Sequence, residues 1–257
     1  MRLLLSLILA VTLLVSGCTS LTDCENVAQH EAILLIDVTD KQLFANIKDD
    51  LNANLPTFME KSGLGTINVC QSFTLTMAPI SAKEGLQASS ETISISRKGQ
   101  SYQAEKSQAS PAPLVRLMKN KLSEFDSMTD DAAVTSGSSI ANVLVKALSN
   151  TTIEAETTVI VFSDMVENNQ YLNMYRDVPS TDNSSEATRQ LIDPVVLQEF
   201  QTLQKQGLDA NIIIVFKESP NSNINSKQRE VKGFWVALLN ELDLHNVEFM
   251  DNLTNVN

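Results

Sequence analysis

The sequence predicts an α/β fold: a single three-layer, doubly wound, mainly parallel sheet with one short antiparallel edge strand. Three continuous apolar runs carry this prediction, because such runs are typical of strands buried on both faces. They are Ala32–Ile36, Thr157–Phe162 and Asn211–Phe216, and polar residues follow each of them. Segments with helical spacing of apolar residues separate the runs. Strands that alternate with helices favour a parallel sheet covered on both faces.

The remaining strands are predicted from less extensive apolar patterns. Residues Thr66–Met77 are rich in β-branched residues and predict a second strand, while Thr92–Ser96 alternates with period two, as a half-exposed edge strand does. Val247–Met250 predicts a short final strand.

The helices are predicted from apolar spacing and from residues typical of helix ends. Leu43, Ile47 and Leu51 recur every four residues and begin an amphipathic helix, whose end Pro56 disturbs. Asp193 before Pro194 predicts a helix start, and Gly207 predicts where that helix stops. Other helices are predicted around Leu114–Phe125, Ile140–Leu148 and Val231–Leu242.

Composition limits the classes of function. The 257 residues include 19 Lys and Arg against 31 Asp and Glu, a formal net charge of −12. The pI near 4.6 leaves nothing to drive sequence-independent binding to nucleic acid. Neither of the Gly-rich phosphate-binding motifs occurs in the sequence, which disfavours a nucleotide-binding fold.

The first residues are typical of a secretory signal. Met1–Arg2 is a minimal positive start, and Leu3–Val15 is an apolar run too short for a bilayer core of about 30 Å. The run ends in Val15-Ser16-Gly17-Cys18, which resembles the lipobox of bacterial lipoproteins. The resemblance implies cleavage before Cys18 and lipidation (palmitate among the acyl chains) of that cysteine. An ordinary signal peptide with an incidental cysteine is the alternative.

This resemblance also implies a location. By the habit of the family, Thr19 in place of an Asp after the cysteine implies a lipid anchor in the outer membrane, facing the periplasm. The predicted organisation is then a signal peptide (1–17), a lipidated cysteine and tether (18–30), one domain (31–252) and a tail (253–257).

Two further cysteines, Cys24 and Cys70, remain after the predicted cleavage. An oxidising compartment allows a disulfide between them. Two buried free thiols are the alternative, and the sequence leaves both open.

Three segments place oxygen atoms where buried strands end or a helix begins: Asp37–Lys41, Ser136–Ile140 and Ser163-Asp164. In open α/β sheets, ligands bind beyond the carboxyl ends of the strands. With the order of elements, these segments resemble the von Willebrand factor type A (vWA) domain over residues 31–252. That resemblance implies the vWA fold and a metal-ion-dependent adhesion site, where Mg²⁺ is completed by an acidic group of a protein partner.

The resemblance transfers the metal ligands residue by residue. Asp37 and Thr39 match the first turn of the family, Ser138 matches the Thr at the helix start, and Asp164 matches the Asp of the third turn. Lys41 departs from the pattern, since it stands where a second hydroxyl ligand belongs. Two alternatives stay open: a Mg²⁺ site, or a metal-free site in which Lys41 turns inward and pairs with Asp37 or Asp164.

Simpler interpretations exist for some of these residues. Ser138 can serve as an ordinary helix N-cap without any metal. Met165 replaces the Gly that follows the last Asp in the family. Asp130 and Asp131 are more typical of a solvated loop than of paired catalytic acids.

An enzyme is the second hypothesis. Asp37-Val38-Thr39 after a buried strand also resembles the nucleophile turn of haloacid-dehalogenase-type phosphohydrolases, with Ser163 as the phosphate-binding hydroxyl. Thr39 stands where most of these enzymes have their general acid, which counts against catalysis. The favoured function is therefore an envelope lipoprotein that is not an enzyme, has no catalytic residues, and binds a protein partner through a rim formed by residues 37–41, 136–139 and 164–190.

Overall fold

The computed structural model describes residues 28–61, 71–81, 91–96, 112–131, 136–179, 186 and 190–251. The predicted signal peptide, Cys18, Cys24, Cys70 and the tail lie outside these residues, so their predicted roles remain predictions. Every helix in the described part of the chain is too short or too polar to cross a membrane.

Within these residues, one six-stranded sheet has the strand order β3-β2-β1-β4-β5-β6. The strands are β1 (Ala28–Asp37), β2 (Gln71–Ile80), β3 (Glu91–Ser96), β4 (Ala155–Ser163), β5 (Ala210–Phe216) and β6 (Val247–Met250). All neighbours pair in parallel except β2 and β3, which are antiparallel. The predicted α/β class and its single antiparallel edge strand are confirmed.

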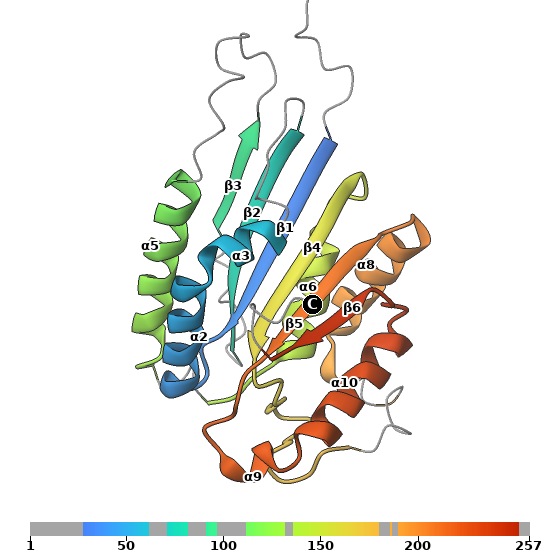
Figure 1. The fold of residues 1–257 in the computed structure, drawn as a ribbon. Helices are drawn as coiled ribbons and strands as arrows, with labels where there is room; N and C mark the ends of the chain where they lie inside the picture. Colours follow the sequence, from blue (N-terminus) through green and yellow to red (C-terminus); the bar gives the residue numbers. More distant parts are fainter. Residues whose placement is uncertain are drawn as a thin grey trace, which may run out of the picture.

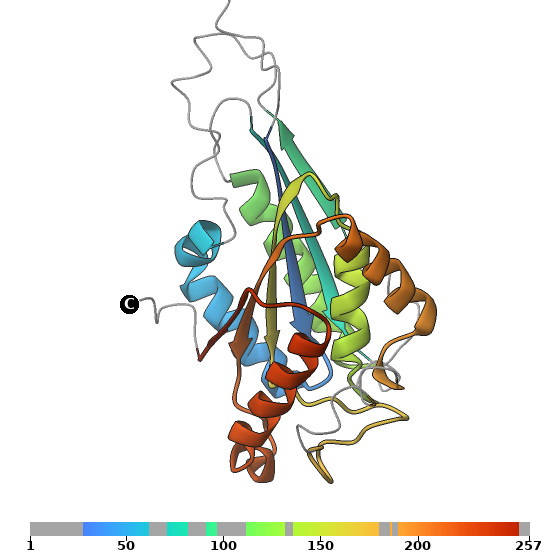
Figure 2. The ribbon, with the colours of Figure 1, turned by 90° about the vertical axis from the view of Figure 1, so that its right-hand side faces the viewer.

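Helices cover both faces of the sheet (Figures 1 and 2). One face carries α2 (Lys41–Ala53), α3 (Leu55–Lys61) and α5 (Ala112–Met128), and the other carries α6 (Ile140–Ser149), α8 (Pro194–Lys205) and α10 (Gln228–Glu241). A single turn, α9 (Ser222–Asn225), precedes α10. The molecule therefore has three layers.

The central strand β1 shows why the apolar runs are continuous. Its residues Ala32, Leu34 and Ile36 belong to the hydrophobic cluster under α2 and α5, whereas Ile33 and Leu35 belong to the cluster under α6, α8 and α10. Successive side chains of a strand point to opposite faces, so a strand between two helical layers needs apolar residues at every position. The two clusters fix the register of the sheet.

The predicted helix ends are confirmed where the structure describes them. Asp193 Oδ1 accepts hydrogen bonds from the amides of Val195 and Val196 at the start of α8. Gly207 lies just beyond the helix with a φ of +94°, a conformation that glycine adopts without strain. The segment that begins with Leu43 forms two helices, because α2 ends at Ala53 and Pro56 lies in the first turn of α3.

Candidate functional site

The carboxyl ends of β1, β4 and β5 meet at one edge of the sheet, at the bottom of Figure 1. Asp37 is the last residue of β1, and Ser163 is the last residue of β4. Ile36 of β1 pairs with Phe162 of β4, so the two strand ends are neighbours. The parallel pairing predicted from sequence thus brings the turns after these strands together.

Asp37 is fully buried, and both of its carboxyl oxygens are hydrogen-bonded. Oδ1 accepts from the backbone N–H of Thr39 at 3.0 Å and from its hydroxyl. Oδ2 accepts from the hydroxyl of Ser163 at 2.6 Å. Burial raises the pKa of Asp37, and these hydrogen bonds oppose the rise.

Asp164 is also buried, but its hydrogen bonding is incomplete. Oδ1 accepts from the backbone N–H of Val166 at 3.1 Å, whereas Oδ2 has no hydrogen bond of standard length and angle. Burial and, after it, the negative charge of Asp37 together raise the pKa of Asp164 to about 7, and a hydrogen bond from the Ser219 hydroxyl opposes the rise. Two acids that repel each other therefore lie at the strand ends.

Ser138 lies two residues before the start of α6 and pairs with the turn after β4. Its backbone exchanges two hydrogen bonds with Asn168, at 2.7 and 3.0 Å. The residue at the N-cap position is Ser139, and neither serine caps the helix through its side chain; Ser138 Oγ is buried without a hydrogen-bond partner. The interpretation of Ser138 as an ordinary N-cap is therefore wrong.

Met165 adopts the backbone conformation that a glycine would take at this position. Its φ is +58°, which costs a residue with a Cβ about 1 kcal/mol or more. Three features hold it there: its N–H donates to Ser163 Oγ at 2.8 Å, its carbonyl accepts from Trp235 Nε1 at 2.6 Å, and its side chain is buried in the core. Met165 therefore holds a backbone turn of the kind that glycine adopts without strain.

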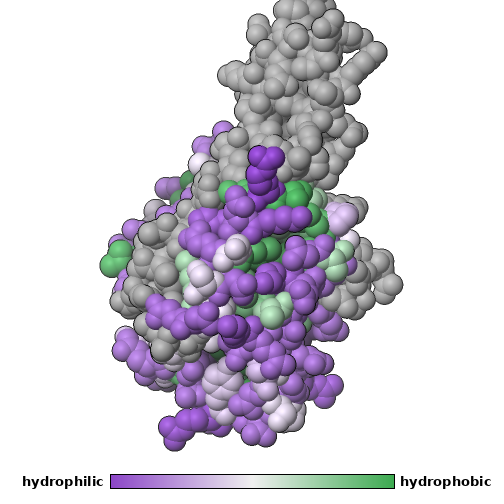
Figure 3. Space-filling model, turned by 90° about the vertical axis from the view of Figure 1, so that its left-hand side faces the viewer, coloured by the Kyte–Doolittle hydropathy of each residue, from purple (hydrophilic) through white to green (hydrophobic). Residues whose placement is uncertain are grey.

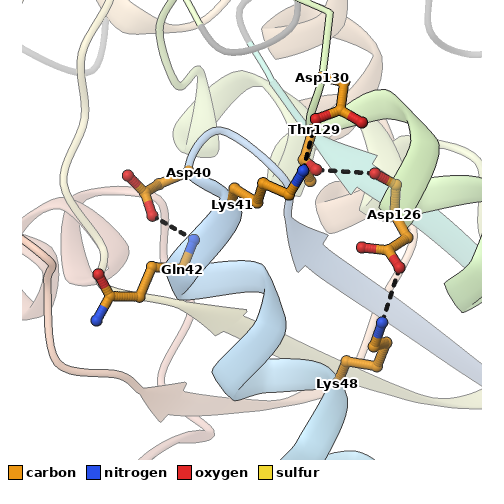
Figure 4. A network of polar contacts seen from close by, with 7 residues as sticks. All are labelled: Asp40, Lys41, Gln42, Lys48, Asp126, Thr129 and Asp130. Atoms are coloured by element: carbon orange, nitrogen blue, oxygen red, sulfur yellow. Dashed lines mark hydrogen bonds and ion pairs between the residues drawn. The ribbon is translucent and has the colours of Figure 1, made fainter.

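The side chain of Lys41 extends toward Asp130 (Figure 4). Its ammonium lies 2.7 Å from Asp130 Oδ1, and both side chains are more than two-thirds exposed, at 68% and 69%. The hydrogen bond to Asp130 raises the pKa of Lys41. The hypothesis that Lys41 turns inward to pair with Asp37 or Asp164 is therefore wrong, because its partner lies on the solvent side. Asp130 and Asp131 are both exposed, as a solvated loop requires.

Three residues of this region are not singled out by the sequence prediction, although its rim 164–190 includes the first two: Glu167, Tyr175 and Ser219. Glu167 is completely buried, and burial raises its pKa to about 8. Burial also raises the pKa of the Tyr175 phenol, as does the charge of Asp164. No local motif marks any of the three as a site residue.

The arrangement disfavours the phosphohydrolase hypothesis. A nucleophilic carboxylate needs a free, ionised oxygen. Both oxygens of Asp37 are engaged by Thr39 and Ser163, and burial favours its protonated form. Asp37 is therefore poorly prepared to attack phosphorus.

Two buried oxygen atoms bear on the predicted cation site. Among the described residues, Ser138 Oγ and Asp164 Oδ2 are the buried side-chain oxygens without a hydrogen-bond partner. The described part of the chain holds no group of three or more His, Cys, Asp or Glu side chains placed for a metal. Any cation here would depend on hydroxyl oxygens as well as on carboxylates.

No protein-family model matches this sequence, and no curated protein matches it either. In structure, the chain is similar to the pilus adhesin SpaC from Lactobacillus rhamnosus GG. The open conformation of that adhesin matches with 11% identity and a TM-score of 0.40, covering 90% of this chain and 29% of the adhesin. A second crystal form matches with 12% identity and a TM-score of 0.42, over the same shares of both chains. This chain thus spans less than a third of the adhesin's length, and a match at this level says nothing of what it binds.

Proposed function

We propose that this chain is a lipid-anchored protein of the bacterial envelope whose vWA-like domain captures a protein partner. The partner would bind at the rim formed by residues 37–41, 136–139 and 164–190. Mg²⁺ held by Asp37, Thr39, Ser138 and Asp164 would receive an acidic group of the partner as a further ligand. The metal would supply a positive charge that binds acidic groups of both the partner and this acidic domain.

The observation that carries this proposal is the pair of unpartnered buried oxygens. Ser138 Oγ and Asp164 Oδ2 lack a hydrogen bond, and both residues are ligands that the sequence predicts. An unsatisfied buried polar atom costs about 1–3 kcal/mol, so two of them within the predicted ligand set support a bound ion or water as their partner. Mg²⁺ prefers oxygen ligands of this kind, carboxylates and hydroxyls.

The electrostatics support a cation over a metal-free site. Asp37 and Asp164 repel each other, and Asp40 adds to the negative potential at both. Among the described residues, no lysine forms an ion pair with either acid, and Lys41 pairs with Asp130 on the solvent side. A divalent cation would lower the pKa of both acids and remove the repulsion.

The anchor rests on the sequence around Cys18 and on the composition. A lipidated cysteine with several acyl chains holds a protein to a membrane effectively permanently. About ten residues separate Cys18 from the first described residue of β1, which is enough for a short tether. The acidic domain would then project from an outer-membrane anchor into the periplasm.

Metal titration of the full chain in mild detergent tests the site. We expect Mn²⁺ and Mg²⁺ to bind and to raise the melting temperature as the concentration of metal increases. Asp164→Asn should weaken Mn²⁺ binding by about 100-fold or more, because it replaces a charged ligand. The matched control is Asp130→Asn, which removes an exposed acid and should leave binding unchanged. A flat response of the wild-type chain to both metals would exclude the metal site.

Cell fractionation tests the anchor. The wild-type chain should be recovered in the membrane fraction, with a mass increased by the acyl chains. Cys18→Ser should abolish the added mass and the membrane recovery, while Cys24→Ser should change neither. Recovery of Cys18→Ser in the membrane fraction would contradict the lipid anchor.

A further inference from the structure

The helix α6, which begins two residues after Ser138, does not cap itself. A helix leaves its first backbone N–H groups without partners inside the helix, and the residue at the N-cap position normally satisfies one of them. Ser139 holds that position in α6 and makes no side-chain cap hydrogen bond. By contrast, Asp40 and Asp193 cap α2 and α8 in this way.

Glu167 supplies the missing cap from another part of the chain. Its Oε2 accepts from the backbone N–H of Ala141 at 3.1 Å, and the N–H of Ile140 donates to the same carboxyl. Its Oε1 accepts from the side-chain amide of Asn169 at 2.7 Å. Glu167 is completely buried, so no water replaces these contacts. The turn after β4 therefore caps a helix that precedes it by more than twenty residues.

The same turn also holds Ser138. Asn168, the next residue after Glu167, exchanges both backbone hydrogen bonds with Ser138. Asp164 lies three residues before Glu167 in this turn. The start of α6 and the Asp164 turn are thus joined at two adjacent points, one through a side chain and one through the backbone.

We propose that Glu167 is a positioning residue: by capping α6, it fixes the hydroxyl of Ser138 relative to Asp164 so that both can hold one cation. This inference rests on the proposed function, since it assigns a role to a residue that supports the metal site. Glu167 itself makes its contacts with Ala141, Ile140 and Asn169, and it acts on the site only through them.

The chemistry of this cap predicts which substitution preserves it. Burial raises the pKa of Glu167 to about 8, so near neutral pH the side chain is largely an uncharged acid. Glutamine has the same length and keeps a carbonyl oxygen for the helix N–H groups, and it loses only the acceptor that Oε1 offers to the Asn169 amide. Alanine offers no acceptor, and aspartate is one methylene shorter. The position should therefore accept Gln and reject both Ala and Asp.

The experiment measures the dissociation constant of Mn²⁺ by electron paramagnetic resonance, on the full chain in mild detergent. Glu167→Ala and Glu167→Asp should each weaken Mn²⁺ binding by about 10-fold or more, as loss of a group that orients a metal ligand does. Glu167→Gln should restore most of the affinity. The matched control is Asp193→Ala, which removes the cap of α8, should lower the melting temperature, and should leave Mn²⁺ affinity unchanged.

The outcomes separate this inference from the proposed function. If the wild-type chain binds Mn²⁺ and Glu167→Ala binds it equally well, the positioning role is overturned and the metal site stands. If Glu167→Ala does not fold, Glu167→Asp decides in the same way. If Glu167→Gln is as weak as Glu167→Ala, the neutral cap is overturned. If the wild-type chain binds no metal, both the proposed metal site and the positioning role of Glu167 in it are overturned.

Discussion

Two groups of acidic residues on this molecule have opposite surroundings. At the strand ends, Asp37 and Asp164 are buried, and no lysine in the part of the chain that the structure describes pairs with them. On the face that carries α2 and α5, Asp126 and Asp130 form ion pairs with Lys48 and Lys41 (Figure 4). The surface on that side of the molecule is mainly hydrophilic (Figure 3).

The difference shows that the surroundings decide what an acid can do. The acids of the α2–α5 face are solvated and already have cations beside them, so they have little left to bind. The acids at the strand ends have raised pKa values because burial and mutual repulsion oppose their charge. A ligand that carries positive charge gains most from the second group.

The dependence of stability on pH should separate the two groups most strongly. The pKa values of Asp164 and Glu167 rise on folding from 3.8 and 4.5 to about 7 and about 8. The folded chain therefore holds more protons than the unfolded chain across this window, and stability without metal should fall as pH rises from about 4 to about 8, by up to ~1.4 kcal/mol per pH unit and group.

Denaturant unfolding at several pH values in the presence of a chelator measures this dependence. Asp164→Asn and Glu167→Gln should each flatten the slope, whereas Asp130→Asn should leave it unchanged. A stability that rises over the same window would contradict the raised pKa values.

The next largest effect should come from an ion pair that is mostly buried. Lys217 pairs with Asp50 of α2, with side chains only 11% and 14% exposed. Lys217→Met should lower the free energy of unfolding by about 2–4 kcal/mol, because it leaves a carboxylate nearly buried without its cation. Lys48→Met is the control, since the Lys48–Asp126 pair is more exposed, and it should cost at most about 1 kcal/mol. Equal losses in urea unfolding would show that burial does not distinguish the pairs.

A smaller effect is expected at the turn that follows Asp164. Trp235→Phe keeps an aromatic ring in the core but removes the hydrogen bond to the Met165 carbonyl. The buried carbonyl would lose its donor, at a cost of about 1–2 kcal/mol. The free energy of unfolding in urea measures it, with Phe234→Leu as a control for aromatic packing alone. If only Phe234→Leu lowered the free energy of unfolding and Trp235→Phe did not, the hydrogen bond of Trp235 would contribute nothing measurable to stability.

The smallest effect should be at Lys41. Lys41→Met removes the exposed pair with Asp130 and should leave the midpoint of thermal unfolding and the Mn²⁺ affinity unchanged. A change in Mn²⁺ affinity in Lys41→Met would show that Lys41 contributes to the proposed metal site.

Much of the fold follows from local patterns in the sequence. The continuous apolar runs predict β1, β4 and β5 because a strand between two helical layers must be apolar at every position. The same parallel arrangement predicts that Asp37 and Asp164 lie at one edge of the sheet. Their role as metal ligands remains a prediction.

The direction of Lys41 and the cap by Glu167 do not follow from local patterns. Lys41 turns outward because Asp130, eighty-nine positions later in the chain, lies beside it on the surface. Glu167 caps α6 because the turn after β4 folds back onto the start of that helix. Both depend on contacts between distant segments, and a sequence motif records only neighbours in the chain.

The hydrogen bond from Trp235 to Met165 has an optical consequence. Trp235 is the only tryptophan of the chain, so its emission comes from one buried indole. That indole donates to the carbonyl of the residue directly after Asp164. A ligand that shifts this turn changes the environment of the indole, and the intrinsic fluorescence of the unlabelled chain then reports the occupancy of the strand-end site.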